Sequence, residues 1–183
     1  MSTETATRRL HWGCGSSVAP GWINADRVDH GGVDVVGDIR DGLPIESATI
    51  DYAFSMHALQ EVELPAVVPV LEELRRILRP GGVLRLCLPD LDKAIDAYRR
   101  GDASHFLISD EEARTLGGKL ITHMLWYGHS RALFTADFAE ELLRKAGFAR
   151  IEHVAHGATA STFPEIMALD DRAHESLFVE AFA

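Results

Sequence analysis

The stretch of sequence that decides the fold is residues 51–90, DYAFSMHALQEVELPAVVPVLEELRRILRPGGVLRLCLPD. Between residues 67 and 78 the apolar side chains recur on one face of a helix and charged side chains occupy the other, which predicts an amphipathic helix. The run 79–82, RPGG, ends that helix. Apolar segments of strand length precede it at 51–55 and follow it at 83–88. This β-α-β unit predicts a parallel sheet with a right-handed crossover.

Further strand candidates lie on both sides of this unit. They are residues 9–12, 22–25 and 33–36 before it, and residues 149–154 and 177–182 after it. A helix is predicted over residues 136–146, with Thr135 at its N-cap and Gly147 just beyond its end. The order of elements predicts an α/β fold.

The connections between the first strands are short. Only six residues separate Gly15 from Trp22, and the stretch from Asp26 to Val33 is similar. A parallel crossover that contains a helix needs at least about 10 to 12 residues. We therefore expect the first helices to be shortened or absent, which leaves one sheet face thinly covered. A second copy of the chain, in a homodimer, or residues 91–127 would then cover that face.

The length of 183 residues fits a single domain spanning residues 1–183. We expect roughly the first seven residues to lie outside the folded part, because they are polar and carry no pattern. Residues 91–127 have a helical pattern, with breaks near Gly101 and at Gly117-Gly118. We interpret this segment as an insertion that caps the ligand-binding edge of the sheet.

Composition and charge exclude several classes of function. The net charge is -10 and no basic stripe occurs, so the sequence argues against duplex nucleic acid as a partner. No apolar segment approaches the ~20 residues that a membrane span requires, and no export signal is present. The two cysteines, Cys14 and Cys87, are too few for a disulfide framework. These features predict a cytoplasmic protein.

Three strand ends carry residues suited to binding adenosine. The first strand runs into the glycine loop of LHWGCG, residues 10–15, and ligands of open α/β sheets bind beyond the carboxyl ends of strands. Asp26, after the second strand, is placed to accept both ribose hydroxyls, and Asp38, after the third, to accept the adenine amine. Singly, each has an ordinary explanation as a turn or cap residue. Their order and spacing favour one shared site.

These residues resemble a known family, the class I methyltransferases that depend on S-adenosylmethionine (SAM), and within it a compact branch whose second strand reads GWIN-x-D. The resemblance is strong over about residues 9–100 and weaker beyond them. The motifs that carry it are LHWGCG (10–15), GWINAD (21–26), GDIR (37–40), LP (43–44), LRPGG (78–82) and LPDL (88–91).

The resemblance implies a Rossmann-like sheet of about seven mostly parallel strands, the last of them antiparallel. It also implies SAM as the cofactor. The cofactor contacts it implies are Gly13, Cys14 and Gly15 in the loop, Asp26 at the ribose, Asp38 and Ile39 at the adenine, and Ser55, with Met56 and His57, beside the methionine portion.

The sequence departs from the family pattern in two motifs. His11 stands where the class has an acidic residue or the branch has asparagine. Residues 57–62 read HALQEV where the branch has His-x-Leu-Glu-His, so that only the first histidine is kept. No role can be assigned to the missing glutamate and histidine.

Methyl transfer from a sulfonium mainly requires that the acceptor be held in line with the reacting bond. A base helps when the acceptor is a hydroxyl, and histidine suits that role near neutral pH. His57, directly after the fourth predicted strand, is the first candidate, followed by His129 and His123. Trp126 and Tyr127 are candidate substrate contacts. Each of these residues also has an ordinary interpretation as a structural or surface residue.

The sequence thus predicts a SAM-dependent methyltransferase that methylates oxygen or nitrogen of a small-molecule acceptor. The nine histidines form no H-x-x-x-H metal motif, and no G-x-S-x-G elbow occurs. One alternative is a non-catalytic SAM-binding partner subunit, since a Glu and a His of the branch motif are missing. The other is an NAD-dependent oxidoreductase, whose G-x-G-x-x-G fingerprint would need glycine at Val18.

Overall fold

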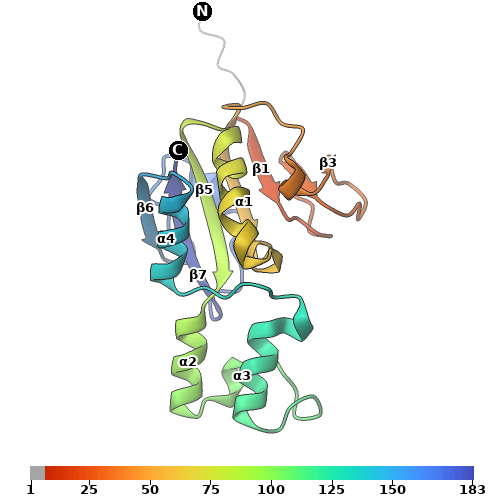
Figure 1. Cartoon of the computed structure of the whole chain (residues 1–183), viewed down its shortest axis with the longest axis vertical. Helices are drawn as coiled ribbons and strands as arrows, with labels where there is room; N and C mark the ends of the chain where they lie inside the picture. The colour runs from red at the N-terminus through yellow and green to blue at the C-terminus, as the bar shows by residue number, and fades with distance from the viewer. Residues whose placement is uncertain (1–6) are drawn as a thin grey trace, which may run out of the picture.

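The computed structural model of the chain describes residues 7–183, so most of the N-terminal stretch expected to lie outside the fold is not among the described residues. The chain forms one seven-stranded sheet in the order β3-β2-β1-β4-β5-β7-β6 (Figure 1). The strands are β1 (Arg9–Trp12), β2 (Ile23–Asp26), β3 (Val35–Val36), β4 (Ile50–Met56), β5 (Leu78–Pro89), β6 (Arg150–Val154) and β7 (Ser176–Phe182).

The sheet is mostly parallel, as predicted. Pairing is parallel from β3 through β2, β1 and β4 to β5, and β7 is antiparallel to both of its neighbours, β5 and β6. The last strand is therefore the one that runs against the rest. The predicted strands all occur, with ends within a few residues of those expected. β5 is the exception, because the structure extends it back through the RPGG turn to Leu78.

The first crossovers contain no α-helix among the described residues. Turns join β1 to β2 and β2 to β3, and a single 3-10 turn, η1 (Ile39–Asp41), follows β3. The prediction of shortened first helices is confirmed. Since no helix dipole faces the first loop, backbone and side chains near the strand ends must supply the polar groups there.

One face of the sheet packs against α1 (Leu64–Ile77) and α4 (Ala136–Lys145), which lie side by side in front of it in Figure 1. The apolar stripe of α1 is fully buried with the inward side chains of β4, β5 and β7. Burying side chains of this size stabilises the fold by roughly 1.5 to 3 kcal/mol each. This core fixes the carboxyl ends of the central strands.

The opposite face is covered by the chain itself. Phe163, Ile166, Met167 and Leu169, in and around η5 (Pro164–Met167), pack against Tyr52, Phe54 and Phe178 of the central strands. The expectation that residues 91–127 cover this face is wrong, because this C-terminal connection supplies the apolar cover. A homodimer is not needed for that purpose, although dimerisation itself stays a prediction.

Residues 91–127 form a helical lobe beyond the carboxyl end of β5, seen at the bottom of Figure 1. It comprises α2 (Leu91–Arg100), η3 (Ala103–His105), α3 (Leu116–Leu125) and the start of η4 (Trp126–Gly128), with a small apolar core of its own. Gly101, at φ 72°, ends α2. The lobe lies at the edge where ligands of such sheets bind, and its role as a cap stays a prediction. None of the helices within residues 7–183 is long and apolar enough to cross a membrane.

Candidate functional site

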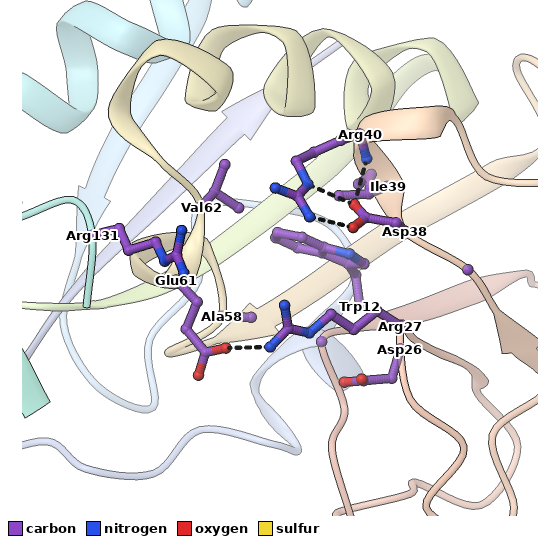
Figure 2. A pocket seen from close by; sticks show the side chains of 12 residues that line it. Trp12, Asp26, Arg27, Asp38, Ile39, Arg40, Ala58, Glu61, Val62 and Arg131 are labelled. Carbon is purple, nitrogen blue, oxygen red and sulfur yellow. Dashed lines mark hydrogen bonds and ion pairs between the residues drawn. The ribbon is translucent and has the colours of Figure 1, made fainter. Parts of the chain in front are cut away.

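A cavity opens at the carboxyl ends of β1 and β2, between the turn after β3 and the loop after β4 (Figure 2). Several chain segments that are distant in sequence contribute to it. Its lining residues are Trp12, Gly13, Asp26, Arg27, Gly37, Asp38, Ile39, Arg40, Ala58, Glu61, Val62 and Arg131. Of the predicted cofactor contacts, the structure brings together Gly13, Asp26, Asp38 and Ile39 around this one cavity.

The glycine loop is a tight turn locked onto the end of β2. The backbone N–H groups of Gly13 and Cys14 both donate to the carbonyl of Ala25, at 2.8 and 3.3 Å. Gly13 has φ 69°, and a Cβ built on it would lie 2.2 Å from the Cβ of Ala58. Only glycine fits here for two reasons: other residues are strained at this positive φ, and any side chain would clash with the neighbouring loop.

Asp26 connects this turn to the cavity. Its Oδ2 accepts a hydrogen bond from the Gly15 N–H at 2.9 Å, and its Oδ1 accepts one from the Val28 N–H at 3.0 Å. A carboxylate has about four acceptor positions, so about two are left. The carboxylate is therefore held in place while it can still accept hydrogen bonds from the two hydroxyls of a ribose.

Asp38 and Ile39 form the wall beyond β3. Ile39 is buried and presents an apolar side chain. Asp38 caps η1, and its hydrogen bonds with Arg40 lower the pKa of the carboxyl to about 2. The wall thus combines an apolar surface with a permanently ionised carboxylate, which suits a planar base that carries an amine.

Two predicted cofactor contacts, Cys14 and Gly15, lie beside the cavity lining rather than in it, and Ser55 lies behind the glycine turn. The Ser55 hydroxyl is buried without a hydrogen-bond partner, 3.9 Å from a Cβ built on Gly13. A buried hydroxyl without a partner is costly unless a ligand completes it. Since none of these three residues lines the cavity, their contact with a cofactor stays a prediction.

Sequence reasoning missed the charged rim of the cavity. Arg27 and Glu61 reach toward each other at 3.9 Å (Figure 2). Arg131 pairs with Glu63. Arg27 directly follows the predicted ribose contact, which was a usable signal. Arg131 reaches the site only because its N–H and that of the next residue bind the carbonyl of Gln60, a contact across 71 residues that no local pattern reveals.

His57 lies at the end of β4, next to the cavity residue Ala58. Its backbone is left-handed, at φ 50°, and its Nε2 is 2.8 Å from the Oγ of the buried Ser176. Burial lowers the pKa of His57 to about 4, and the nearby carboxylate of Glu175 opposes this shift only in part. The imidazole is therefore neutral at physiological pH.

His123, on α3, faces the sheet edge from the lobe. Its Nε2 lies 3.4 Å from the Oε2 of Glu175, and its Nδ1 accepts a hydrogen bond from the Leu107 N–H at 3.4 Å. Burial lowers its pKa, and Glu175 again opposes the shift. Sequence reasoning missed Glu175, which is 5% exposed, because the residue stands in a stretch without any motif.

The other candidates near the lobe are exposed. His129 follows η4 on the surface, and Trp126 and Tyr127 are 39% and 57% exposed. The Tyr127 hydroxyl donates to the carboxylate of Glu112. The structure does not bring these three residues to the cavity. Within residues 7–183, no group of three or more His, Cys, Asp or Glu side chains is arranged to hold a metal ion.

The chain is similar in part to known methyltransferases. Residues 10–86 match the family model described as a methyltransferase domain. A demethylmenaquinone methyltransferase of Lactococcus lactis subsp. lactis is 29% identical over 119 residues, which cover 64% of this chain. The chain spans about half of that relative's length, 46%.

Solved structures share the fold across nearly the whole chain. A SAM-dependent methyltransferase of Thermotoga maritima, described as a possible histamine N-methyltransferase, superposes with a TM-score of 0.60 at 19% identity, over 96% of this chain and 81% of that one. A putative methyltransferase of Haloferax volcanii, solved with the Trm112 methyltransferase activator, gives a TM-score of 0.56 at 19% identity, over 100% and 84%. Residues 10–86 thus resemble a methyltransferase domain, and the likeness to these solved structures shows a shared fold.

Proposed function

We propose that this protein is an enzyme that transfers the methyl group of SAM directly to oxygen or nitrogen of a small-molecule acceptor. The observation that carries the proposal is the convergence of three strand ends on one cavity. The Gly13 turn, the Asp26 carboxylate and the Asp38-Ile39 wall lie around it in the order that the portions of an adenosyl cofactor require.

The cofactor is proposed to lie across the carboxyl end of β1. Asp26 would accept the ribose hydroxyls, Asp38 and Ile39 would contact the adenine, and Gly13, Cys14, Gly15 and Ser55 would surround the methionine portion. The lining of one cavity by Gly13, Asp26, Asp38 and Ile39 supports this placement. When bound, SAM supplies a methyl group that its sulfonium already activates.

His57 is proposed as the general base for a hydroxyl acceptor. Its hydrogen bond to Ser176 occupies Nε2, which leaves Nδ1 to take a proton. The low pKa of His57 keeps that nitrogen unprotonated at physiological pH. An amine acceptor would need no base if it arrived unprotonated, and His57 would then only orient it.

His123 and His129 are the further catalytic candidates, with Trp126 and Tyr127 as acceptor contacts. Since both ring nitrogens of His123 have partners, its proposed part is to orient groups at the sheet edge. His129, Trp126 and Tyr127 would reach the acceptor only from the rim of the lobe, which we propose as the cap of the site.

A small acceptor, rather than nucleic acid, is proposed because each cavity arginine is already paired with a carboxylate. The names of the Lactococcus and Thermotoga relatives both refer to small organic acceptors. We also propose a cytoplasmic location, since Cys14 and Cys87 are both free thiols. The methyltransferase-domain match does not favour an NAD-dependent oxidoreductase.

Transfer of an isotopically labelled methyl group tests this proposal. The protein would be incubated with methyl-labelled SAM and a small-molecule extract of the source cells, and labelled products would be identified by mass spectrometry. We expect a labelled small molecule, and less of it with Asp26→Ala when SAM is limiting. Tight SAM binding without label transfer to any component would instead favour the non-catalytic partner subunit.

A further inference from the structure

Arg40 is the cavity arginine whose side chain is held most firmly. Arg27 approaches Glu61 only to 3.9 Å at an exposed rim position. Arg40 instead turns back along the cavity, and in the view of Figure 2 its guanidinium lies beside Asp38 and above the Trp12 ring. Arg40 and Trp12 both line the cavity.

Two carboxylate oxygens fix the plane of this guanidinium. Asp38 Oδ1 accepts from the Arg40 backbone N–H at 3.0 Å and from Nε at 2.9 Å, and Oδ2 accepts from Nη2 at 2.5 Å. Forked pairing of this kind sets both distance and orientation. The Asp38 pKa of about 2 keeps the pair ionised throughout the physiological range.

This pairing limits what Asp38 itself can offer a ligand. Three of its roughly four acceptor positions are already taken by Arg40. At most one hydrogen bond from an adenine amine can be added. The carboxylate therefore serves mainly to hold the guanidinium of Arg40, which lines the cavity.

We propose that Arg40 recognises the adenine of the cofactor by stacking its guanidinium on the purine ring, with Asp38 as the positioning residue that holds its plane. A guanidinium stacks well on aromatic rings, which a lysine ammonium does not. Ile39 and Val62 supply the apolar surroundings of the base. This inference rests on the proposed binding of SAM.

Calorimetric titration with S-adenosylhomocysteine (SAH), the demethylated cofactor, tests the role of Arg40. Stacking on a base contributes about 1 to 3 kcal/mol, so Arg40→Ala should weaken SAH binding about fivefold or more. Arg40→Lys should weaken it similarly, because it keeps the charge and loses the plane. Arg144→Ala is the matched control, since it removes an arginine paired with Glu140 on α4; its affinity should equal that of the wild type.

A second comparison isolates the positioning role of Asp38. In the Asp38→Asn variant, the carboxylate that holds the Arg40 guanidinium in its plane is already lost. Adding Arg40→Ala to this variant should therefore weaken SAH binding little further. The SAH analogue with hypoxanthine in place of adenine lacks the exocyclic amine. Arg40→Ala alone should reduce the affinity for SAH and for this analogue by the same factor, because stacking does not depend on the amine. Circular dichroism would verify folding, and Arg40→Gln would replace any variant that fails to fold.

The outcomes separate this inference from the proposed function. Wild-type affinity in Arg40→Ala would refute a contact with the base, and wild-type affinity in Arg40→Lys would show that charge matters rather than the plane. Full additivity with Asp38→Asn would remove the positioning role. A folded wild-type protein that does not bind SAH would overturn the proposed function, and this inference with it.

Discussion

At the scale of single residues, the site depends on a few side chains that each have one geometric task. Asp26 holds the glycine turn through the Gly15 N–H and still faces the cavity. Asp26 could be predicted from the sequence, because it is a carboxylate that directly follows a strand. The cavity arginines were not predicted. Arg40 stands only two residues from its partner Asp38, but Arg27 meets Glu61 only through the fold.

Replacing Asp26 by alanine should weaken SAH binding by at least ~1 kcal/mol, which is about fivefold, because a charged acceptor of the ribose hydroxyls is lost. Calorimetry measures this directly. Asp29→Ala is the control, since Asp29 is exposed and its Oδ1 accepts the Gly31 N–H within the same loop. Equal affinities of the two variants would show that the ribose lies elsewhere.

Gly13→Ala should destabilise the fold by ~2 kcal/mol or more. The new Cβ would lie 2.2 Å from that of Ala58, and overpacking costs about 1 to 3 kcal/mol in addition to the left-handed backbone. Gly15→Ala should cost less, because open space surrounds that position. Urea unfolding measures both, and Gly13→Ala with Ala58→Gly should recover part of the loss. No recovery would mean that the clash is not the cause.

At the scale of elements, prediction succeeded where a pattern is local. The α1 stripe and its RPGG end fixed the β-α-β unit, and short spacings indicated missing helices. The prediction that residues 91–127 cover the second sheet face was wrong. The segment that covers it, η5 with its flanking residues, has no periodic pattern in the sequence. They are held by long-range contacts, above all the buried pairs of Arg85 with Asp170 at 2.5 Å and Glu180 at 2.8 Å.

Arg85→Met should therefore destabilise the protein by about 3 to 5 kcal/mol, because two buried carboxylates lose their partner. Chemical unfolding would measure the loss, with Arg99→Met as the control at an exposed pair. A loss no greater than that of the control would show that Arg85 does not hold the C-terminal connection on the sheet.

The segment after β4 should make stability depend on pH. Burial lowers the pKa of His57 from 6.5 to about 4 in the folded state, so the unfolded chain binds the proton more readily. Its contribution, up to ~3 kcal/mol, is present above pH 6.5 and is lost as the pH falls toward 4. Glu175, Asp171, Arg172 and His123 are the charged or titratable groups that act on it.

Unfolding free energies at several values between pH 7.5 and 4 would measure this effect. His57→Asn should reduce the slope, whereas His30→Asn, at an exposed position, should leave it unchanged. A wild-type slope in His57→Asn would mean that the imidazole does not titrate with unfolding.

At the scale of the whole molecule, the chain is a seven-stranded α/β sheet with α1 and α4 on one face, its own C-terminal connection on the other, and a helical lobe at the carboxyl edge. The overall α/β class followed from the sequence because a β-α-β unit constrains its strands to run parallel, whereas the strand order came from the structure. The cavity followed in part: its residues Gly13, Asp26, Asp38 and Ile39 were predicted to share one site, whereas its charged rim was not predicted.

The central claim is that this cavity binds SAM. Calorimetric titration of the folded protein with SAM, SAH and NAD tests it most directly. The account predicts a saturable heat with SAM and SAH and none with NAD. A folded sample that gives no heat with SAM or SAH would contradict it.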